Sequence, residues 1–476
     1  MKNSERVRNH QLRWQWLMTG LILLVAAPLW SQADNPPPVA AMVGFDHSST
    51  PPENNVCDAP DDRMLTPPPV SREPFAMVPS SEERFNYLRY GLSFTSSYTD
   101  NALGPTDGHP VSDVGNTVFP VVALDASNTR SHWQLTYAPG FTFYQRASEL
   151  NQADQNAVVA GQYRLSPHVT LEARDVFQKS SSVFNQPDFG LAGTVSGGTV
   201  GTNGSVIAPI ADRLSNTGNA GITYQFSRNS MVGMSGAFSN LHFPTPAQVP
   251  GLYDGAAQTG AAFYAFRAGS HYLGAVYEYQ RLMAYPAEGV SETQTQAAFL
   301  FYSFHPAPGL SVSFFGGPQY ARTLQPAQSP LRQAPPELQG WTPAGGASLN
   351  WQGRLSSFAL AYLHHIGESG GLMGAVRMDS ATVSFGRQIT RDLSASLNGG
   401  YVQNNVIGTA QLGIADGHTI FGTVSVLQQL GPHLSLQLGY TRLRQDYADV
   451  PVLSSTPNTN REFVSLSYQF SRPLGR

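Results

Sequence analysis

The chain has 476 residues, a formal net charge of −4 at pH 7 and 13% charged residues, against roughly 25% in soluble globular proteins. Without a basic excess it offers no patch for nucleic acid. Its single cysteine, Cys57, excludes an internal disulfide and a cysteine-based metal cluster. The chain is instead rich in Gly, Ser, Thr, Asn, Gln and aromatic residues, which suits a structure with one apolar face and one uncharged polar face.

Residues 1–33 have the pattern of a secretory signal peptide. Four basic residues precede an apolar stretch at 17–30, and Ser31-Gln32-Ala33 forms a small-x-small cleavage site. The alternative is an uncleaved anchor helix, but the apolar run is short for a span of about 20 residues and contains Pro28. The sequence therefore predicts that the mature chain is secreted.

Residues 34–84 form a predicted Pro-rich disordered linker. Eleven prolines lie within 34–80, and such a stretch cannot bury enough apolar area to offset the entropy of ordering it. A periplasmic tether or a plug is the functional alternative for this segment.

From about Arg89 onward, apolar and polar residues alternate with period two, which is typical of β-strands. The segment YRLSPHVTLEARDVF (163–177) shows the recurring unit, which is two alternating runs joined by a short polar tip. Eight such hairpins have tips near 127, 166, 228, 268, 306, 353, 389 and 430. With one strand before them (90–98) and one after (463–470), the total is about 18, within a range of about 16–20.

The connections between the hairpins are longer than the tips. They run through 99–115, 145–156, 178–215, 239–256, 282–292, 322–340, 365–377, 402–417 and 442–461. In an antiparallel meander all short turns share one end and all long loops the other, which is typical of outer-membrane barrels. The sequence therefore predicts an all-β fold, a transmembrane antiparallel up-and-down β-barrel at 85–476.

Three details favour a membrane barrel over a soluble sandwich. The predicted strands are about 9–11 residues long, the length that crosses a tilted bilayer span. The apolar face is nearly free of Lys and Arg, which are destabilising in the bilayer. A ring of about 18 strands would also enclose an aqueous lumen. Asp175 is the exception on the apolar face, and we expect it near the outer rim or at a local bulge. Aromatic residues near the short turns suit an interfacial girdle; they are Tyr163, Tyr224, Phe226, Phe266, Phe304, Trp351, Phe385 and Phe470.

A β-propeller is the main rival, because the tips recur at intervals close to those of propeller blades. A blade requires four short strands in that interval, whereas this sequence has two long ones and no recurring blade motif.

Several phrases of the sequence carry a resemblance to a known family. They are YGLSFTSSYTDNAL (90–103), YQRASELNQADQNAVVAGQYRLSPHVTL (144–171), FFGGPQY (314–320) and GGASLNWQGRLSSFALAY (345–362). With these, the chain resembles outer-membrane β-barrel proteins of the porin type that follow a Pro-rich N-terminus. The resemblance implies an outer-membrane location in a diderm bacterium and names no substrate.

The resemblance also implies a partner. Barrels of this type end on an alternating strand with a terminal aromatic residue that the assembly machinery reads, and 463–470 matches with Tyr468 and Phe470 facing outward. The chain departs from this pattern by continuing through 471–476. The other partners expected are outer-membrane lipid and no nucleic acid, and the sequence leaves a homo-oligomer open.

No motif for enzyme chemistry or for a cofactor stands out. The chain has no phosphate-binding loop and no nucleophile elbow. His364 and His365, followed by Glu368, could suggest a metal pair, but adjacent strand residues point to opposite faces. We therefore expect no metal, no cofactor and no enzyme activity. The Gly-rich segment 189–206 is interpreted as a solvated outer loop, with a constriction loop folded into the lumen as the alternative.

The candidate channel-lining residues are Glu172, Arg174, Glu278, Gln280 and Arg281. They carry both signs of charge, so a selective field would be weak. The sequence predicts a porin-like channel for passive passage of small hydrophilic solutes or an exported polymer. The alternative is a non-conducting surface barrel that displays loops for adhesion or a structural role.

Overall fold

A computed structural model describes the chain at 86–102, 110–182, 184, 187–189, 195–197, 210–286, 289–307, 309–324, 338–368, 370–372, 374–407, 416–447 and 458–473. The predicted signal peptide (1–33) and Pro-rich linker (34–84) lie outside these residues. Within them no helix has the length and the hydropathy that a membrane span requires.

The described chain is almost entirely β-structure, with two short 3-10 turns. The elements are β1 (Tyr87–Thr99), β2 (Asp113–Ser127), β3 (Ser131–Tyr137), β4 (Gly140–Tyr144), η1 (Ser148–Leu150), β5 (Gln152–Arg164), β6 (Val169–Ser182), β7 (Pro187–Phe189), β8 (Val195–Gly197), β9 (Ile210–Ser227), β10 (Ser230–His242), η3 (Pro246–Gln248), β11 (Gly255–Ala268), β12 (His271–Ala284), β13 (Ser291–Ala307), β14 (Leu310–Leu324), β15 (Leu338–Gln352), β16 (Ser356–Gly367), β17 (Val376–Gln388), β18 (Leu393–Val406), β19 (Gly417–Gln429), β20 (Leu434–Tyr447) and β21 (Asn458–Pro473).

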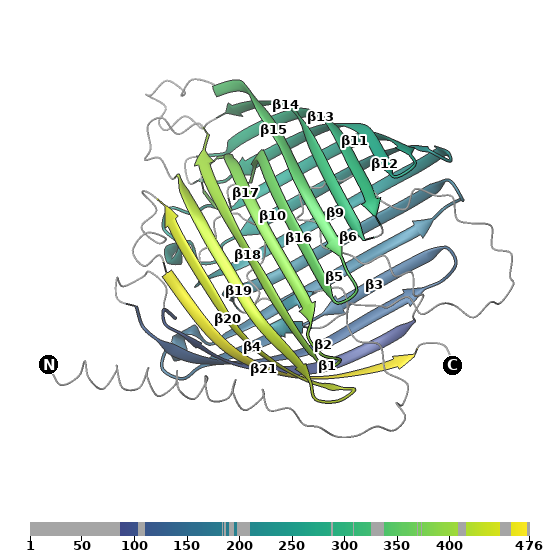
Figure 1. Ribbon diagram of the computed structural model, residues 1–476. Helices are drawn as coiled ribbons and strands as arrows, with labels where there is room; N and C mark the ends of the chain where they lie inside the picture. The colour runs from purple at the N-terminus through teal and green to yellow at the C-terminus, as the bar shows by residue number, and fades with distance from the viewer. Residues whose placement is uncertain are drawn as a thin grey trace, which may run out of the picture. The chain divides into compact units, whose positions relative to one another are not determined.

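These strands close into a single antiparallel ring (Figure 1). Each wall strand pairs with its neighbours along the chain, and β1 pairs with both β2 and β21. β3 and β4 occupy one place in the wall, since both lie between β2 and β5. The described part of the chain therefore forms an 18-strand barrel. The predicted barrel and its strand number are confirmed, and the propeller alternative is wrong.

The connections alternate in length as the sequence predicts. Two to four residues join the strands of each predicted hairpin, whereas six or more separate one hairpin from the next. Both ends of the barrel chain lie at the short-turn end, because Tyr87 of β1 pairs with Pro473 of β21. β21 thus continues past Phe470 as a paired strand, and Ser471 still lies opposite Arg89.

The wall has an apolar outer face and a more polar inner face. On β12, Leu273, Tyr277 and Tyr279 face outward and are exposed, whereas Glu278 and Gln280 face inward and are buried. The eight aromatic residues expected near the short turns all belong to the outer face, as the register of their strands shows. Without water in the bilayer, every backbone group of such a wall must pair within it, and closure of the ring leaves no free edge.

The wall strands are longer than predicted, at 12–18 residues outside the divided β3–β4 position. They continue beyond the apolar belt toward the long loops, where outward positions become polar. A tyrosine girdle marks this transition, since tyrosine hydroxyls there donate to amide or carboxylate oxygens at the rim; the pairs are Tyr137–Gln155, Tyr277–Gln296, Tyr320–Gln339, Tyr362–Asp379, Tyr401–Gln403 and Tyr440–Asn460. An apolar ring with a polar tip suits a membrane–water boundary.

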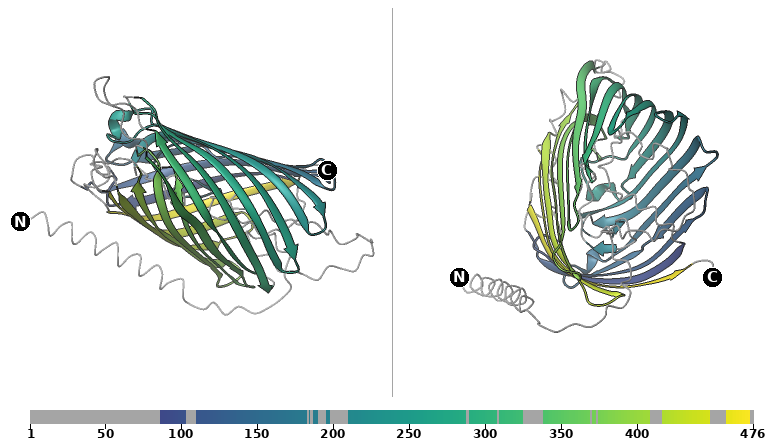
Figure 2. Two further views of the ribbon diagram at one scale, coloured as in Figure 1. Left: turned by 90° about the horizontal axis from the view of Figure 1, so that it is seen from above. Right: turned by 45° about the vertical axis from the view of Figure 1, so that its right-hand side comes forward.

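Glycines allow close backbone packing in the wall at β14 and β15, whose strands run obliquely around the ring (Figure 2). A side chain at Gly317 would begin 1.9 Å from the carbonyl oxygen of Ala298, and one at Gly345 would begin 2.7 Å from that of Phe315. On the inner side of this region, Phe299 and Phe315 pack edge to face at 5.5 Å. Glycine in a strand interior often marks such a close approach of backbones.

Asp175 lies at a regular position of β6, which excludes one of the two explanations expected for it. It is the seventh residue of β6, and the register with β9 is unbroken from Val169 to Ser180, so the strand has no bulge there. Its side chain belongs to the outer face, where Gly218 and Val159 lie directly opposite. On the outer face of β6, Phe177 and then Lys179 follow Asp175 toward the long loops, so its expected place near the outer rim stays a prediction. A charge on the outer face is destabilising to a degree that depends on its depth.

Replacement of Asp175 by valine is expected to stabilise the barrel. The gain should stay below the cost of about 2–4 kcal/mol for Arg or Lys at the midplane, because acids cost less there. The measurement is the urea midpoint of unfolding from phospholipid vesicles. Asp446→Val, which alters an exposed outward acid on β20 beyond the tyrosine girdle, is the matched control and should change little. A lower midpoint for Asp175→Val would show instead that the carboxyl group makes a stabilising contact.

Candidate functional site

Much of the inner wall is lined by hydroxyl groups that hydrogen-bond to one another across neighbouring strands. The pairs and their oxygen–oxygen distances are Ser93–Ser465 (3.1 Å), Thr117–Thr142 (3.0 Å), Thr293–Thr323 (3.0 Å), Ser303–Ser313 (2.8 Å), Ser396–Ser425 (2.8 Å) and Thr423–Thr441 (3.1 Å). Buried hydroxyls are tolerated when they are paired in this way. The result is an interior surface that is polar and carries no charge over most of the ring.

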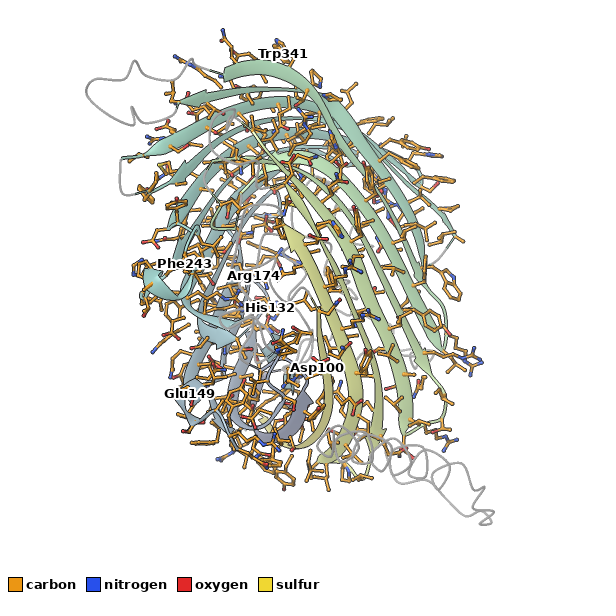
Figure 3. The ribbon with its side chains drawn as sticks, turned by 90° about the vertical axis from the view of Figure 1, so that its left-hand side faces the viewer. Asp100, His132, Glu149, Arg174, Phe243 and Trp341 are labelled. Carbon is orange, nitrogen blue, oxygen red and sulfur yellow. The ribbon has the colours of Figure 1, made fainter. Side chains whose placement is uncertain are left out.

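Charged side chains gather on one sector of the inner wall, formed by β3, β5, β6 and β9. Glu172 and Arg174 lie on the inner face of β6, and both are exposed. Figure 3 shows Arg174 and His132 on the inner side of the barrel. His132 lies 3.0 Å from Asp125, and Arg213 of β9 faces inward opposite Ser180. The sector carries both signs, so it is polar without being strongly basic or acidic.

The two candidates on β12 face inward but are almost covered. Glu278 is 5% exposed and Gln280 is 2% exposed. Their neighbours across β13 are Ala297 and Thr295. The structure therefore brings Glu172 and Arg174 together on an accessible surface, and places Glu278 and Gln280 elsewhere, within packed side chains. A role for any of the four in lining a channel stays a prediction.

Arg281 lies on the outer face, which differs from the expectation that it lines the lumen. It donates two hydrogen bonds, of 2.8 and 2.7 Å, to the carboxylate of Glu292 on β13. Both side chains share the face of Tyr279, near the tyrosine girdle. The physical reason is the alternation itself, because Arg281 directly follows Gln280 and successive strand residues point to opposite faces.

The inner wall also holds a residue of the connection that follows β6. Phe184 packs against the inward residues Val402, Phe421 and Leu443 of β18, β19 and β20. Arg461 of β21, only 2% exposed, donates to the carbonyl oxygen of Phe184, and its guanidinium lies 5.9 Å from the Phe184 ring. Two residues of chain reach at most about 7 Å. Phe184 therefore brings the chain that follows Ser182 across part of the interior to the side chains of β18, β19 and β20.

A second apolar cluster lies at the same end of the barrel. Phe243, Val249 and Leu252 of the β10–β11 connection pack with Leu372 of the β16–β17 connection and with Tyr447 of β20 in one apolar cluster. The two connections are joined by a hydrogen bond of 2.6 Å from the backbone N–H of Tyr253 to the carbonyl oxygen of Gly371. Because the cluster includes side chains from well-separated strands, these connections fold inward against the wall.

The expected constriction at 189–206 falls mostly outside the described residues. Its described piece, Val195–Gly197 in β8, pairs with β7 and lies against β1 and β21. Together with Phe184, this places part of the 178–215 connection against wall strands that are not neighbours of β6 in the ring.

The two adjacent histidines take separate environments. His364 faces outward and lies 2.7 Å from Asp379, whose carboxylate also accepts from Tyr362 at 2.8 Å. His365 is buried. No group of three or more potential metal ligands occurs among the residues that the structure describes.

Sequence reasoning missed Arg461 and Phe184. Alternation in TNREFVSLSYQF (459–470) puts Arg461 on the inner face with Phe463, and this signal was available. The partner of Arg461 could not be predicted, because Phe184 is 277 residues away in sequence and lies in a connection that has no alternating pattern of apolar and polar residues.

No known family model and no curated protein matches this sequence. Among solved structures, the chain is similar to OccK2 (OpdF) of Pseudomonas aeruginosa, with 11% identity and a TM-score of 0.41 over 81% of this chain and 98% of that one. It is similar to the outer membrane protein OpdK of Pseudomonas aeruginosa, with 12% identity and a TM-score of 0.40 over 81% and 99%. It is also similar to OccAB4 of Acinetobacter baumannii, with 8% identity and a TM-score of 0.38 over 82% and 99%.

The architecture follows from the strand pairing and the two faces of the wall rather than from these similarities. An 18-strand ring with an apolar outer face, short turns at one end and long loops at the other is a closed β-barrel of the outer-membrane type.

Proposed function

We propose that the protein is a porin-like channel for passive passage of small hydrophilic solutes or an exported polymer. The observation that carries this proposal is the accessible charged pair Glu172 and Arg174 on the inner face of a closed barrel whose outer face is apolar. Charged side chains exposed inside a ring of this size are consistent with water in the interior.

The outer membrane of a diderm bacterium is the proposed location, reached after secretion through the signal at 1–33. The short turns and both ends of the barrel chain would then lie on the periplasmic side, as in outer-membrane barrels generally. Tyr468 and Phe470 are exposed on the outer face of β21, and Phe470 stacks on Tyr90 of β1 at 5.4 Å. Recognition of this last strand by the assembly machinery remains a proposal that their exposure supports.

The proposed channel has weak ion selectivity, because its charged sector holds both signs and the other inward charges named above, Glu278 and Arg461, are buried. Selection would then depend mainly on the width of the lumen near Phe184 and on wall polarity. We expect neither a cofactor nor an enzyme activity.

A non-conducting surface barrel is the second candidate. The two apolar clusters that pack on the inner wall toward the long-loop end, around Phe184 and around Phe243, specifically favour it. In that case the loops would serve adhesion or a structural role.

Conductance in planar bilayers separates the two candidates. The mature chain, folded in detergent and verified by its heat-modifiable mobility, is expected to give discrete current steps with a small reversal potential in a salt gradient. Folded protein that inserts without steps would favour the second candidate.

Single-charge variants in the lumen should shift the selectivity in opposite directions. Glu172→Gln is expected to move the reversal potential toward anions and Arg174→Gln toward cations, because each removes one fixed charge from the lumen. Asp446→Asn, which removes a charge from the outer face, serves as the control and should leave the reversal potential unchanged. Equal behaviour of all three variants would remove Glu172 and Arg174 from the conducting path.

A further inference from the structure

Two arginines of β20 lie on the outer face just beyond the tyrosine girdle. Arg442 and Arg444 are both exposed and alternate with the buried residues Leu443 and Gln445. Tyr440 precedes them on the same face, and its hydroxyl donates to Asn460 at 2.7 Å. Because tyrosines of this girdle mark the boundary of the apolar belt, the two guanidinium groups lie at the level of lipid headgroups.

The neighbouring strands leave this pair accessible. Gly422 of β19 lies directly opposite Arg442, and it contributes no side chain. Arg444 lies opposite Ile420 of β19 and Asn458 of β21. Residues two apart on a strand have Cα atoms roughly 6.5–7 Å from each other. Two guanidinium groups at this spacing can contact one phosphate group or two adjacent ones.

Within the described residues, the two arginines have no paired counter-charge. Three acids are near: Glu462 lies opposite Tyr440, Asp446 lies beyond Arg444, and the Asp100 carboxylate accepts from Asn460, the residue opposite Arg442. None of these acids forms an ion pair with Arg442 or Arg444. Arg281 provides the contrast. It also lies on the outer face near the tyrosine girdle, but Glu292 already accepts two of its hydrogen bonds. Arg442 and Arg444 thus keep their donors available for a ligand.

We propose that Arg442 and Arg444 form a binding site for the phosphate group of a lipid headgroup in the leaflet at the long-loop end. Arginine matches phosphate oxygens through its planar set of N–H donors, and such charge-assisted hydrogen bonds are stronger than neutral ones. The position at the membrane boundary selects a lipid over a soluble anion, because a lipid presents its phosphate there while its acyl chains cover the apolar belt. The site does not depend on whether the barrel conducts.

The test is lipid binding by the whole mature protein in detergent micelles. Native mass spectrometry would count bound bisphosphorylated lipid A across a titration. The wild-type protein is expected to retain this lipid, and Arg442→Gln with Arg444→Gln should weaken binding at least tenfold. Arg442→Lys with Arg444→Lys should bind with intermediate affinity, because it keeps the charge without the planar donors.

The matched control is Arg387→Gln. Arg387 is an exposed outward arginine on β17, next to the short turns at the other end of the barrel. This variant should bind lipid A within twofold of the wild type. Equal binding by the double glutamine variant, or an equal loss in Arg387→Gln, overturns the proposal.

A second experiment tests whether the site binds a lipid phosphate or a free phosphate ion. Inorganic phosphate at the same phosphate concentration is expected not to displace lipid A, and effective displacement would overturn the assignment to a lipid. Each variant is first checked for heat-modifiable mobility. If the double glutamine variant does not fold, the single variants and the lysine variant decide the outcome in the same assay.

Discussion

Arginine at position 234 is expected to destabilise the barrel by about 2 kcal/mol or more, whereas arginine at position 235 should be nearly neutral. Met234 faces outward on β10 and is 65% exposed, in the belt that the bilayer would surround. The cost of Arg or Lys at the bilayer midplane is about 2–4 kcal/mol. The measurement is the free energy of unfolding from phospholipid vesicles by urea titration.

Ser235 is the matched control, because it is the adjacent residue on the opposite face. It lies opposite Gly221, and Glu172 lies opposite Gly221 on the other side. A side chain at Gly221 would begin 3.0 Å from the Glu172 carboxylate, so that carboxylate already extends over Gly221. Arginine at 235 can therefore reach an acid in the wet interior. Equal destabilisation by both variants would contradict the assignment of the two faces.

Replacement of Arg461 by methionine is expected to increase single-channel conductance. Methionine fills much of the volume but neither donates to the Phe184 carbonyl oxygen nor attracts its ring as a cation. The segment after β6 would then lose its attachment to β21. An increase of roughly 1.5- to 2-fold is expected, since the current through a water-filled pore depends on its narrowest cross-section.

Arg387→Met is the control for this second experiment. Arg387 is exposed on the outer face of β17, next to the short turns. The variant changes the same residue type without touching the interior, so its conductance should equal that of the wild type. An unchanged step size in folded Arg461→Met would show that Phe184 does not limit the conducting path.

The strand number, the antiparallel order and the two ends of the barrel follow from local patterns. Strict alternation along 271–281 and 463–470 fixes which residues share a face, because successive strand residues point in opposite directions. The lengths of the connections fix the short-turn and long-loop ends. Arg281 was expected to line the lumen, but strict alternation with the inward Gln280 already predicts the outer face, where the structure places it beside Glu292.

The alternation and the connection lengths predicted neither the ends of the strands nor the side chains that lie inside the barrel. The strands extend past the apolar belt because cross-strand hydrogen bonding continues into the polar rim, where alternation of hydrophobicity no longer marks it. Of the two explanations expected for Asp175, the bulge is excluded because β6 keeps its register through that position, and the place near the outer rim stays a prediction. Alternation reports the face of a residue and carries no information on its height in the membrane.

The sequence by itself determined the closed, two-faced wall of this protein, since period-two alternation and turn spacing are local properties and lipid leaves no alternative to closure. Only the tertiary structure decided what stands inside that wall. The contact between Arg461 and Phe184 joins residues far apart in the chain, and the cluster of Phe243, Leu372 and Tyr447 joins three separate parts of it. Such contacts arise from how loops without a repeating pattern fold back onto the ring, which depends on the shape of the completed barrel.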